Sequence, residues 1–310
     1  MSGPVIFIMG PTASGKTGLA LALAAHYPLE IVNADSMQIY RQLEIGTAKP
    51  TPAERAQAPH HLFDILEPNT SFSAGRYRQA ALKVIAQCHQ RRTVPILVGG
   101  TGLYFRAVEQ GIVDTPDIPT TIHDQLRSVA KKLGWPEMHK RLQAVDPAGA
   151  ARLTPNDRQR ILRALAVHTA TGITLGDWQS NHHSAPAPFP ILKLGCSCPR
   201  PELYRRIEER FDGMVASGLV AEVQSLLASG LNRELPAMKA VGYRQLFPYL
   251  DGEQSLEEAV VAAKVASRRY AKRQETWFKK ESDLHFIDEQ SQAKAEHLVT
   301  CFLAENTFSA

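Results

Sequence analysis

The stretch GPTASGKT, which begins at Gly10 and ends at Thr17, constrains this chain more than any other. It follows the apolar run VIFIM at residues 5–9 and leads into a helical pattern at residues 19–23. The spacing GxxxxGK[ST] lets backbone N–H groups surround a phosphate, while the lysine adds charge and the threonine hydroxyl can bind Mg²⁺. The positive end of the next helix favours the same ligand. A strand, a phosphate-binding loop and a helix are predicted, and the loop alone suggests ATP.

Length and composition allow a large core and set limits on the environment. The 310 residues can form one large domain or two modest ones, and a net charge of +4 is only mildly basic. Apolar runs are shorter than the roughly 18 residues of a membrane span, so we expect a cytoplasmic protein without a membrane partner, and we expect a monomer. The four cysteines form no CxxC pair, which disfavours a zinc finger or a disulfide framework.

Two further polar sites follow apolar runs that resemble strands. Asp35 comes directly after residues 30–34, and Thr101 lies in the glycine-rich turn GGTG that follows residues 94–98. Ligands gather at the carboxyl ends of parallel strands, so the phosphate loop, Asp35 and Thr101 are predicted to meet in one crevice. For Asp35 a helix cap or a Mg²⁺ ligand of the Walker B kind stays open, and for the turn a purely structural role.

The middle of the chain changes character at residue 116. From there the pattern is helical, with no run typical of a strand until residue 191. We therefore predict an α/β fold: a P-loop-containing parallel-sheet core domain, residues 1–115 together with 187–310, and an inserted small all-helical domain, residues 116–186.

Basic residues cluster in two of the predicted helices. Residues 268–280 place six lysines and arginines around aromatic side chains, and residues 158–163 carry three arginines. Basic side chains interleaved with aromatic ones suit a phosphate backbone and unstacked bases. A solvated helix face is the alternative for each cluster.

Seven strings along the chain resemble the tRNA dimethylallyltransferases (tRNA isopentenyltransferases) of the bacterial type, in the order of that family. The strings, which run almost from end to end, are GPTASGKT from Gly10, NADSMQIYRQLEIGTAKP from Asn33, HHLFDILEP from His60, PILVGGTGLY from Pro95, NDRQRILRAL from Asn156, AVGYRQ from Ala240 and RQETWFKK from Arg273.

The resemblance implies transfer of a dimethylallyl group from dimethylallyl diphosphate to N6 of the adenosine next to the anticodon of tRNA, with release of pyrophosphate. Asp35 is then the candidate general base, Thr101 orients the reactants, and Lys16 stabilises the leaving diphosphate. Thr17 would hold Mg²⁺ as the cofactor. The donor's diphosphate is assigned to the loop residues Gly10, Pro11, Thr12, Ala13, Ser14, Gly15, Lys16 and Thr17.

The resemblance also implies where the anticodon stem-loop of tRNA binds. The implied contacts fall on the strand-end segment, the inserted helix and two later segments: Asp35, Ser36, Met37, Gln38, Thr101, Gln159, Arg160, Ile161, Leu162, Arg163, Ala240, Val241, Gly242, Tyr243, Arg244, Gln245, Arg273, Gln274, Thr276, Trp277 and Lys280.

Three other functions use some of the same features. A P-loop small-molecule kinase needs a Walker B strand in the central region, and the chain offers no clear one. An adenine-nucleotide isopentenyltransferase would not need the inserted basic helix. A nucleotide-gated RNA-binding module without chemistry would use the same loop and basic clusters, and turnover separates it from the enzymes.

Overall fold

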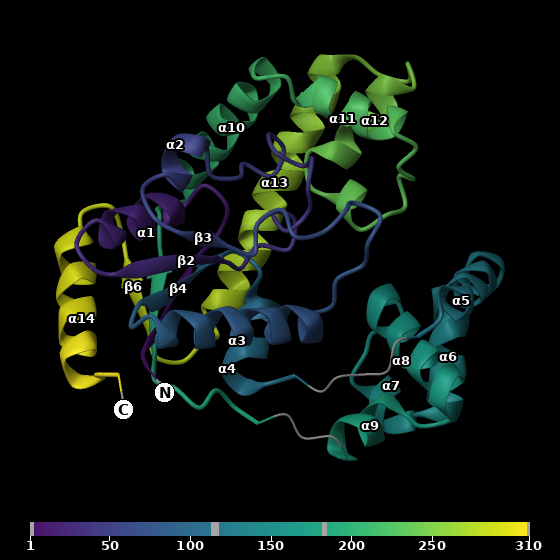
Figure 1. The fold of residues 1–310 in the computed structure, drawn as a ribbon. Coiled ribbons are helices and arrows are strands. Elements are labelled where there is room, and N and C mark those ends of the chain that lie inside the picture. Colours follow the sequence, from purple (N-terminus) through teal and green to yellow (C-terminus); the bar gives the residue numbers. More distant parts are fainter. Residues whose placement is uncertain (1–2, 113–117, 182–184, 309–310) are drawn as a thin grey trace. The chain divides into compact units, whose positions relative to one another are not determined.

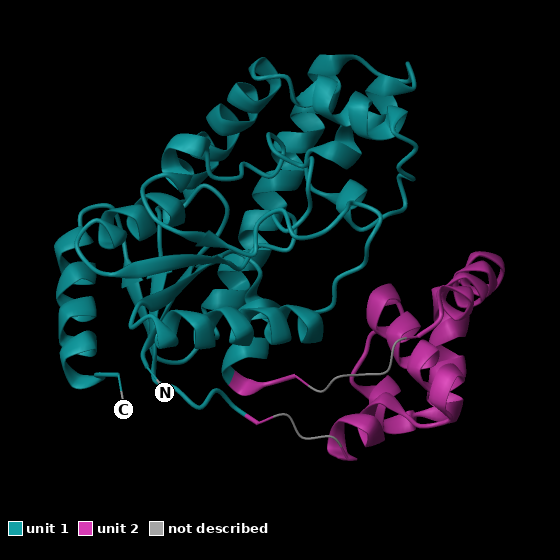
Figure 2. Ribbon diagram, in the orientation of Figure 1, with its two compact units in different colours: residues 1–109, 186–310 teal, residues 110–185 magenta. Residues whose placement is uncertain are grey.

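The computed structural model describes residues 3–112, 118–181 and 185–308. Their contacts divide the chain into two compact units, which Figure 2 colours separately: unit 1 comprises residues 1–109 and 186–310, and unit 2 residues 110–185. The predicted boundary between residues 115 and 116 lies outside the described residues. The predicted end of the insertion at residue 186 is adjacent to the Ala185–Pro186 junction of the two units.

Unit 1 is built on a six-stranded sheet with the order β3-β2-β4-β1-β5-β6, in which every pair of neighbours is parallel. The central strands are buried on both faces, as parallel sheets generally are, and this explains their continuous apolar sequences. The strands are β1 (Val5–Met9), β2 (Leu29–Asn33), β3 (His60–His61), β4 (Val94–Gly99), β5 (Ile191–Cys196) and β6 (Leu284–Ile287).

Helices cover both faces of the sheet because strand side chains alternate. Ile6 and Ile8 pack in one core with α1 and α14, whereas Phe7 and Met9 pack in a second core with α3 and α4. Figure 1 shows α14 and α3 on opposite sides of the strands. These helices are α1 (Lys16–Ala24), α3 (Ala74–Gln90), α4 (Gly102–Gln110) and α14 (Gln292–Glu305).

A further group of helices forms a third core at one end of unit 1 (Figure 1). The segment after β2 joins this core through Ile39, Tyr40 and Leu43, which are all nearly or fully buried. The segment between β2 and β3 is therefore held between the sheet and these helices. The remaining helices of unit 1 are α2 (Pro52–Arg55), α10 (Arg200–Ala216), α11 (Leu219–Ala228), the 3₁₀ turn η1 (Ala237–Lys239), α12 (Tyr243–Leu250) and α13 (Leu256–Phe278).

Unit 2 has its own small apolar core, around Met138, Leu142 and Ile161. The glycine at residue 134, with φ +81°, separates its first two helices, and Asp157 caps the helix that carries the predicted arginines. Its described helices are α5 (Thr120–Leu133), α6 (Trp135–Val145), α7 (Pro147–Ala151), α8 (Arg158–Thr171) and α9 (Leu175–Asn181).

One strand is shorter than its sequence suggests. The run HHLFDI at residues 60–65 is typical of a strand. However, β3 ends at His61, because Leu62 and Asp64 adopt positive φ angles of +62° and +56°. Among the described helices, none is both long and apolar enough to cross a membrane.

Candidate functional site

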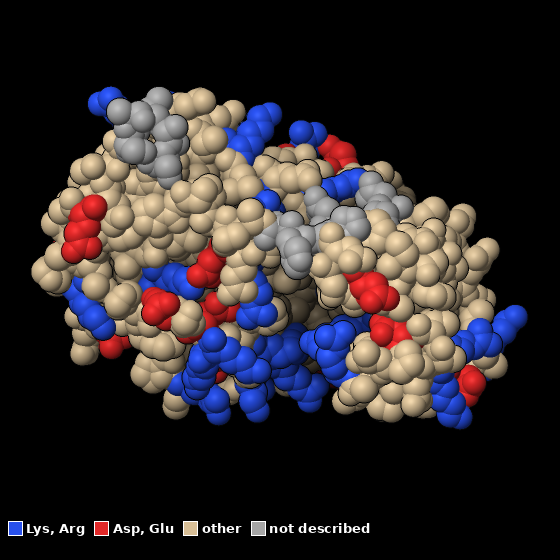
Figure 3. Space-filling view, turned by 90° about the horizontal axis from the view of Figure 1, so that it is seen from below, with Lys and Arg blue, Asp and Glu red and all other residues tan. Residues whose placement is uncertain are grey.

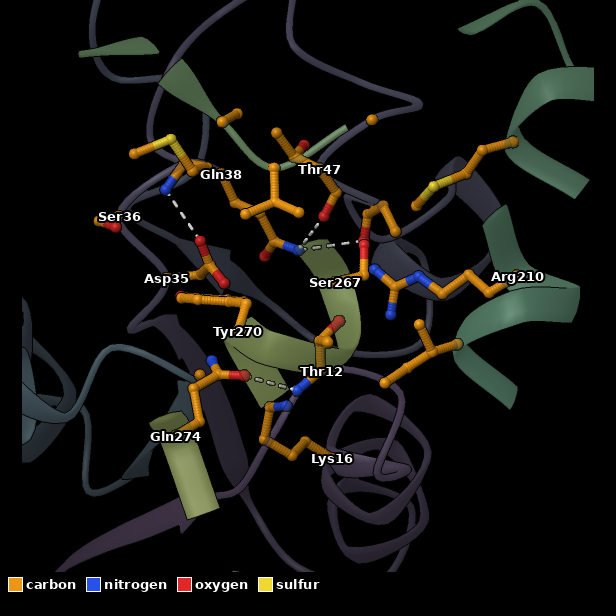
Figure 4. Close-up of a pocket in the computed structure, with 18 of the residues that line it drawn as sticks. Thr12, Lys16, Asp35, Ser36, Gln38, Thr47, Arg210, Ser267, Tyr270 and Gln274 are labelled. Atoms are coloured by element: carbon orange, nitrogen blue, oxygen red, sulfur yellow. Dashed lines mark hydrogen bonds between the residues drawn. The ribbon is translucent and has the colours of Figure 1, made fainter. Parts of the chain in front are cut away.

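A pocket of about 270 Å³ opens in unit 1 beyond the carboxyl ends of the parallel strands. Its walls come from the phosphate loop, the segment after β2, the turn before α12, and helices α10 and α13. Figure 4 shows Lys16 and Thr12 at one end, Asp35 on one side, and Arg210 entering from α10 on the other. The predicted convergence of the phosphate loop and Asp35 is present in this pocket.

The phosphate loop leaves the first turn of α1 open to a ligand. Gly15 precedes the helix with φ +87°, a left-handed conformation that favours glycine, and no side chain caps the helix. Lys16 Nζ donates a hydrogen bond to the Pro11 carbonyl at 2.6 Å and, like Thr12 and Thr17, lines the pocket. Free amides at a helix start beside an ammonium group form an anion site.

Lys16 is poorly hydrated in this pocket. Loss of hydration lowers the pKa of its ammonium group to about 8, against the opposing effects of Cys196 and Asp35, and the charge of Arg210 lowers it further. The pKa of Arg210 is also lowered by desolvation, and Asp35 counteracts this. Among the described residues, Lys16, Arg210 and Asp35 have no ion-pair partner within 4.0 Å. A bound anion would stabilise both cations.

Asp35 is held in place by its own turn and by a buried asparagine. Its Oδ1 accepts from the Met37 backbone N–H at 2.8 Å, and its own N–H donates to Asn33 Oδ1 at 2.8 Å. Asn33 is fully buried and donates through Nδ2 to the carbonyls of Asp35 and Leu62. The second carboxylate oxygen of Asp35 is left for a ligand, because no described residue donates to it.

Thr101 lies beside the pocket rather than in its wall. Its hydroxyl oxygen accepts from the Ser36 N–H at 3.0 Å, and its own N–H donates to the Ala34 carbonyl at 3.2 Å. Ser36 lines the pocket, and Thr101 does not. Thr101 therefore fixes the backbone of the segment that follows β2 through these hydrogen bonds.

The GGTG turn is closely packed against α13. A Cβ on Gly100 would lie 2.1 Å from Gln274 Nε2, and one on Gly102 would lie 2.1 Å from Trp277 Nε1. Gln274 is buried, and its amide accepts from the Thr12 N–H at 2.9 Å and donates to the Gly100 carbonyl at 2.9 Å. Gln274 thereby joins the phosphate loop to the GGTG turn, which the RQETWFKK string did not reveal.

Sequence reasoning missed several pocket residues on α10 and α13. Arg210, Ser267 and Tyr270 all line the pocket, and Arg210 points into it in Figure 4. The sequence of α10 has the pattern of an amphipathic helix, in which an arginine is expected at the surface. No local signal in the sequence separates Arg210 from its exposed neighbours.

The residues that the resemblance assigns to tRNA divide by exposure. The side chains of one group are exposed, namely those of Gln159, Arg160, Arg244, Arg273, Thr276 and Lys280. A second group is partly buried: Asp35, Ser36, Met37, Gln38, Thr101, Leu162, Arg163, Val241, Gln245 and Trp277. The structure buries a third group: Ile161, Ala240, Gly242, Tyr243 and Gln274. Figure 3 shows that many lysine and arginine side chains are exposed on the face that it draws.

A P-loop after the first strand of a parallel sheet, facing a carboxylate at the end of the next strand, defines this unit as a P-loop-containing α/β domain. The family model described as IPP transferase matches residues 38–281. A tRNA dimethylallyltransferase of Magnetococcus marinus is 52% identical, over 93% of this chain and 95% of the relative. The chain belongs to the IPP transferase family.

Relatives and solved structures agree with this assignment. A tRNA dimethylallyltransferase of Geobacter metallireducens is 48% identical, over 92% of each chain. The crystal structure of a tRNA isopentenylpyrophosphate transferase from Bacillus halodurans matches with a TM-score of 0.72 and 35% identity, over 98% of this chain and 97% of that one. A eukaryotic dimethylallyltransferase acting on tRNA matches with a TM-score of 0.83 and 27% identity, over 98% and 80%. The predicted family and fold class are confirmed.

Proposed function

We propose that this protein transfers the dimethylallyl group from dimethylallyl diphosphate to N6 of the adenosine 3′ of the anticodon in tRNA and releases pyrophosphate. The observation that carries the proposal is the pocket itself, where the phosphate loop, Lys16 and Arg210 face the carboxylate of Asp35. Membership of the IPP transferase family supports the same reaction.

The reaction exchanges one bond at the donor carbon. The N6 nitrogen forms a bond to the carbon that carries the diphosphate, and the carbon–oxygen bond breaks with its electron pair going to the diphosphate. Negative charge then grows on the leaving group, where Lys16, Arg210 and the amides at the start of α1 can stabilise it. The N6 proton passes to Asp35, whose free carboxylate oxygen accepts it.

Thr101 acts in this proposal through its neighbour Ser36. The hydrogen bond from the Ser36 N–H fixes the backbone that follows Asp35, so the carboxylate keeps its direction. Precise placement of a reacting group contributes strongly to rate, which suits the orienting role predicted for Thr101.

Mg²⁺ suits the diphosphate end of this site. Thr17 lines the pocket and supplies the hydroxyl that a P-loop offers to this ion, and a diphosphate would supply further oxygen ligands. Bound Mg²⁺ would neutralise charge on the leaving group.

The adenosine must leave its stack to reach the pocket, at a cost of a few kcal/mol that contacts to the flipped base and its backbone offset. We assign the phosphate contacts to exposed basic side chains of both units, Arg160 on α8 and Arg273 on α13 among them. The protein is taken to act as a cytoplasmic monomer.

One incubation separates this function from its rivals. The protein is mixed with labelled dimethylallyl diphosphate, Mg²⁺ and either unmodified tRNA or AMP. Label in tRNA supports the proposal, and label in AMP indicates an adenine-nucleotide isopentenyltransferase. Binding of tRNA without transfer would indicate a non-catalytic RNA-binding module, and phosphate transfer from labelled ATP to a small molecule would indicate a kinase.

A further inference from the structure

The segment that follows β2 forms one wall of the pocket, and two parts of it are tied together. Gln38 and Thr47 both line the pocket. Gln38 Nε2 donates to the carbonyls of Thr47 at 2.9 Å and Ala48 at 3.0 Å (Figure 4). This leaves Oε1 of Gln38 as the acceptor for a substrate group. Any shift of residues 47–48 therefore also moves Gln38.

Glu222, in the first turn of α11, holds this segment from outside the pocket. Its Oε2 accepts from the backbone N–H groups of Glu44 at 2.9 Å and Ile45 at 2.7 Å, and its Oε1 accepts from the Gly46 N–H at 3.0 Å. A fourth donor, the Tyr243 hydroxyl, lies 2.5 Å from Oε1. One carboxylate thus closes the turn at residues 44–46 and ties it to α12.

Packing fixes the same junction. A Cβ on Gly46 would lie 1.9 Å from Cε1 of Tyr243, so only glycine fits beneath this ring. Tyr243 is fully buried, and Ala240, on the turn before α12, lines the pocket. Glu222, Gly46 and Tyr243, which we name the latch, therefore join the two segments that form this side of the pocket.

Among the described residues, no hydrogen bond joins the latch to the diphosphate end of the pocket. The phosphate loop is supported by α1 and by Gln274 of α13, and Arg210 is carried by α10. Within the described part of the chain, the side chain of Glu222 is hydrogen-bonded to the turn at residues 44–46 and to Tyr243. The two ends of the pocket are thus held by separate hydrogen bonds, while Phe211 on α10 packs in the same apolar core as Tyr243.

We propose that Glu222 is a positioning residue for the acceptor side of the pocket, where it keeps Gln38 and Thr47 in register for the adenosine. This proposal rests on the proposed function. Glu222 does not line the pocket and acts through the turn at residues 44–46.

The test is Glu222→Gln. Glutamine has the same shape, but its NH₂ group would replace one accepting oxygen and would face the donors that this oxygen now binds. We expect the KM for tRNA at saturating dimethylallyl diphosphate to rise about tenfold, the effect of roughly one hydrogen bond to a charged group. The KM for dimethylallyl diphosphate at saturating tRNA should stay within about twofold of the wild type. Glu209→Gln, which alters an exposed carboxylate on α10, is the matched control.

Tyr243→Phe keeps the test independent of whether Glu222→Gln folds. It removes one donor from the latch and should raise the KM for tRNA in the same selective way, by a smaller factor. In the double variant the combined effect should be smaller than the product of the two single effects, because both changes remove the same hydrogen bond.

Two outcomes overturn the proposal. Equal changes in both KM values would reduce Glu222 to a general stabiliser of the fold, and unchanged values in both variants would remove it from the reaction. A wild-type protein that transfers no label to tRNA would instead refute the proposed function, so the two failures are distinguishable.

Discussion

Charged residues near the two ends of β2 differ in whether other side chains pair with them. At the start of the strand, Glu30 accepts from His61 at 2.6 Å, from Arg91 at 2.7 and 3.1 Å, and from Thr93 at 2.5 Å. After the end of the strand, Asp35, Lys16 and Arg210 share a pocket without an ion pair within 4.0 Å among the described residues. Charges that the fold has paired indicate structure, and charges left facing a cavity indicate a ligand.

A cluster of possible metal ligands lies at the paired end of β2. Glu30, His61 and Cys88 offer ligand atoms that lie within 4.8 Å of one another. Arg91 and Thr93 already donate hydrogen bonds to the carboxylate of Glu30, so a metal ion there would have to displace a guanidinium group. We interpret this cluster as an ion-pair network that joins β2, β3 and the end of α3.

The largest expected effect comes from Asp35→Asn. The asparagine keeps an oxygen that can accept from the Met37 N–H, so the turn survives while the base is removed. We expect single-turnover transfer to fall by about 10²–10⁴-fold, the range for a general base, with tRNA affinity within a few fold. Single-turnover transfer at the wild-type rate would rule out Asp35 as the base.

Arg210→Ala should be the next most severe change. It removes one of the two cations that face the diphosphate, so we expect kcat/KM for dimethylallyl diphosphate to fall about 10²-fold. Arg205→Ala on the same helix is the control, since Arg205 pairs with Glu202 and Glu209 at the surface. Similar losses in both variants would show that Arg210 acts only through the helix.

Arg160 and Arg163 test the RNA surface of unit 2. Replacing both by alanine should weaken tRNA binding about tenfold, because the RNA phosphates would no longer face these two cations. The slope of log affinity against log salt should become shallower by roughly one for each phosphate that an arginine neutralises in the wild type. Lys83→Ala, an exposed change on α3, serves as the control. An unchanged salt slope would remove these two residues from the RNA interface.

The pH dependence of donor binding tests the charge state of Lys16. Its pKa of about 8 means that the ammonium form, which attracts the diphosphate, prevails below pH 8 and is lost above it. We expect kcat/KM for dimethylallyl diphosphate to decline as pH rises through about 8. In Lys16→Arg the decline should move to higher pH, because arginine keeps its charge. A decline at the same pH in this variant would assign it to another group.

The smallest effect on activity is expected at the opposite end of β2. Burial raises the pKa of Glu30, but hydrogen bonds from Arg91, Thr93 and His61 outweigh burial and hold the pKa at about 2. The stabilisation is therefore present at neutral pH and is lost as pH falls from about 4.5 through 2. Glu30→Gln should lower the free energy of unfolding by about 3 kcal/mol while kcat/KM stays near the wild-type value.

Denaturant unfolding and steady-state kinetics on the same Glu30→Gln sample check both halves of this statement. A loss of activity that exceeds the loss of folded protein would contradict the separation of the two ends of β2.

How much of this structure the sequence predicts depends on whether the residues that form a feature lie near one another in the chain. Short local patterns predicted the phosphate loop, the strand before it and the position of Asp35 just after β2. The structure contains these features at the predicted positions. Arg210 and Glu222 act across the fold, and nothing near them in the chain distinguishes them from surface charges. The family resemblance assigned Tyr243 and Gln274 to tRNA, and only the structure shows that both are buried against glycines.

Gly100 and Gln274 are 174 positions apart in the chain, yet a Cβ at residue 100 would occupy space that the Gln274 side chain now fills. A side chain at residue 100 would need a shorter residue at 274, and a shorter residue there would release the Thr12 N–H that Gln274 now engages. These positions are therefore expected to change together during evolution or not at all. Paired substitutions at 100 and 274 among relatives would record this constraint as covariation.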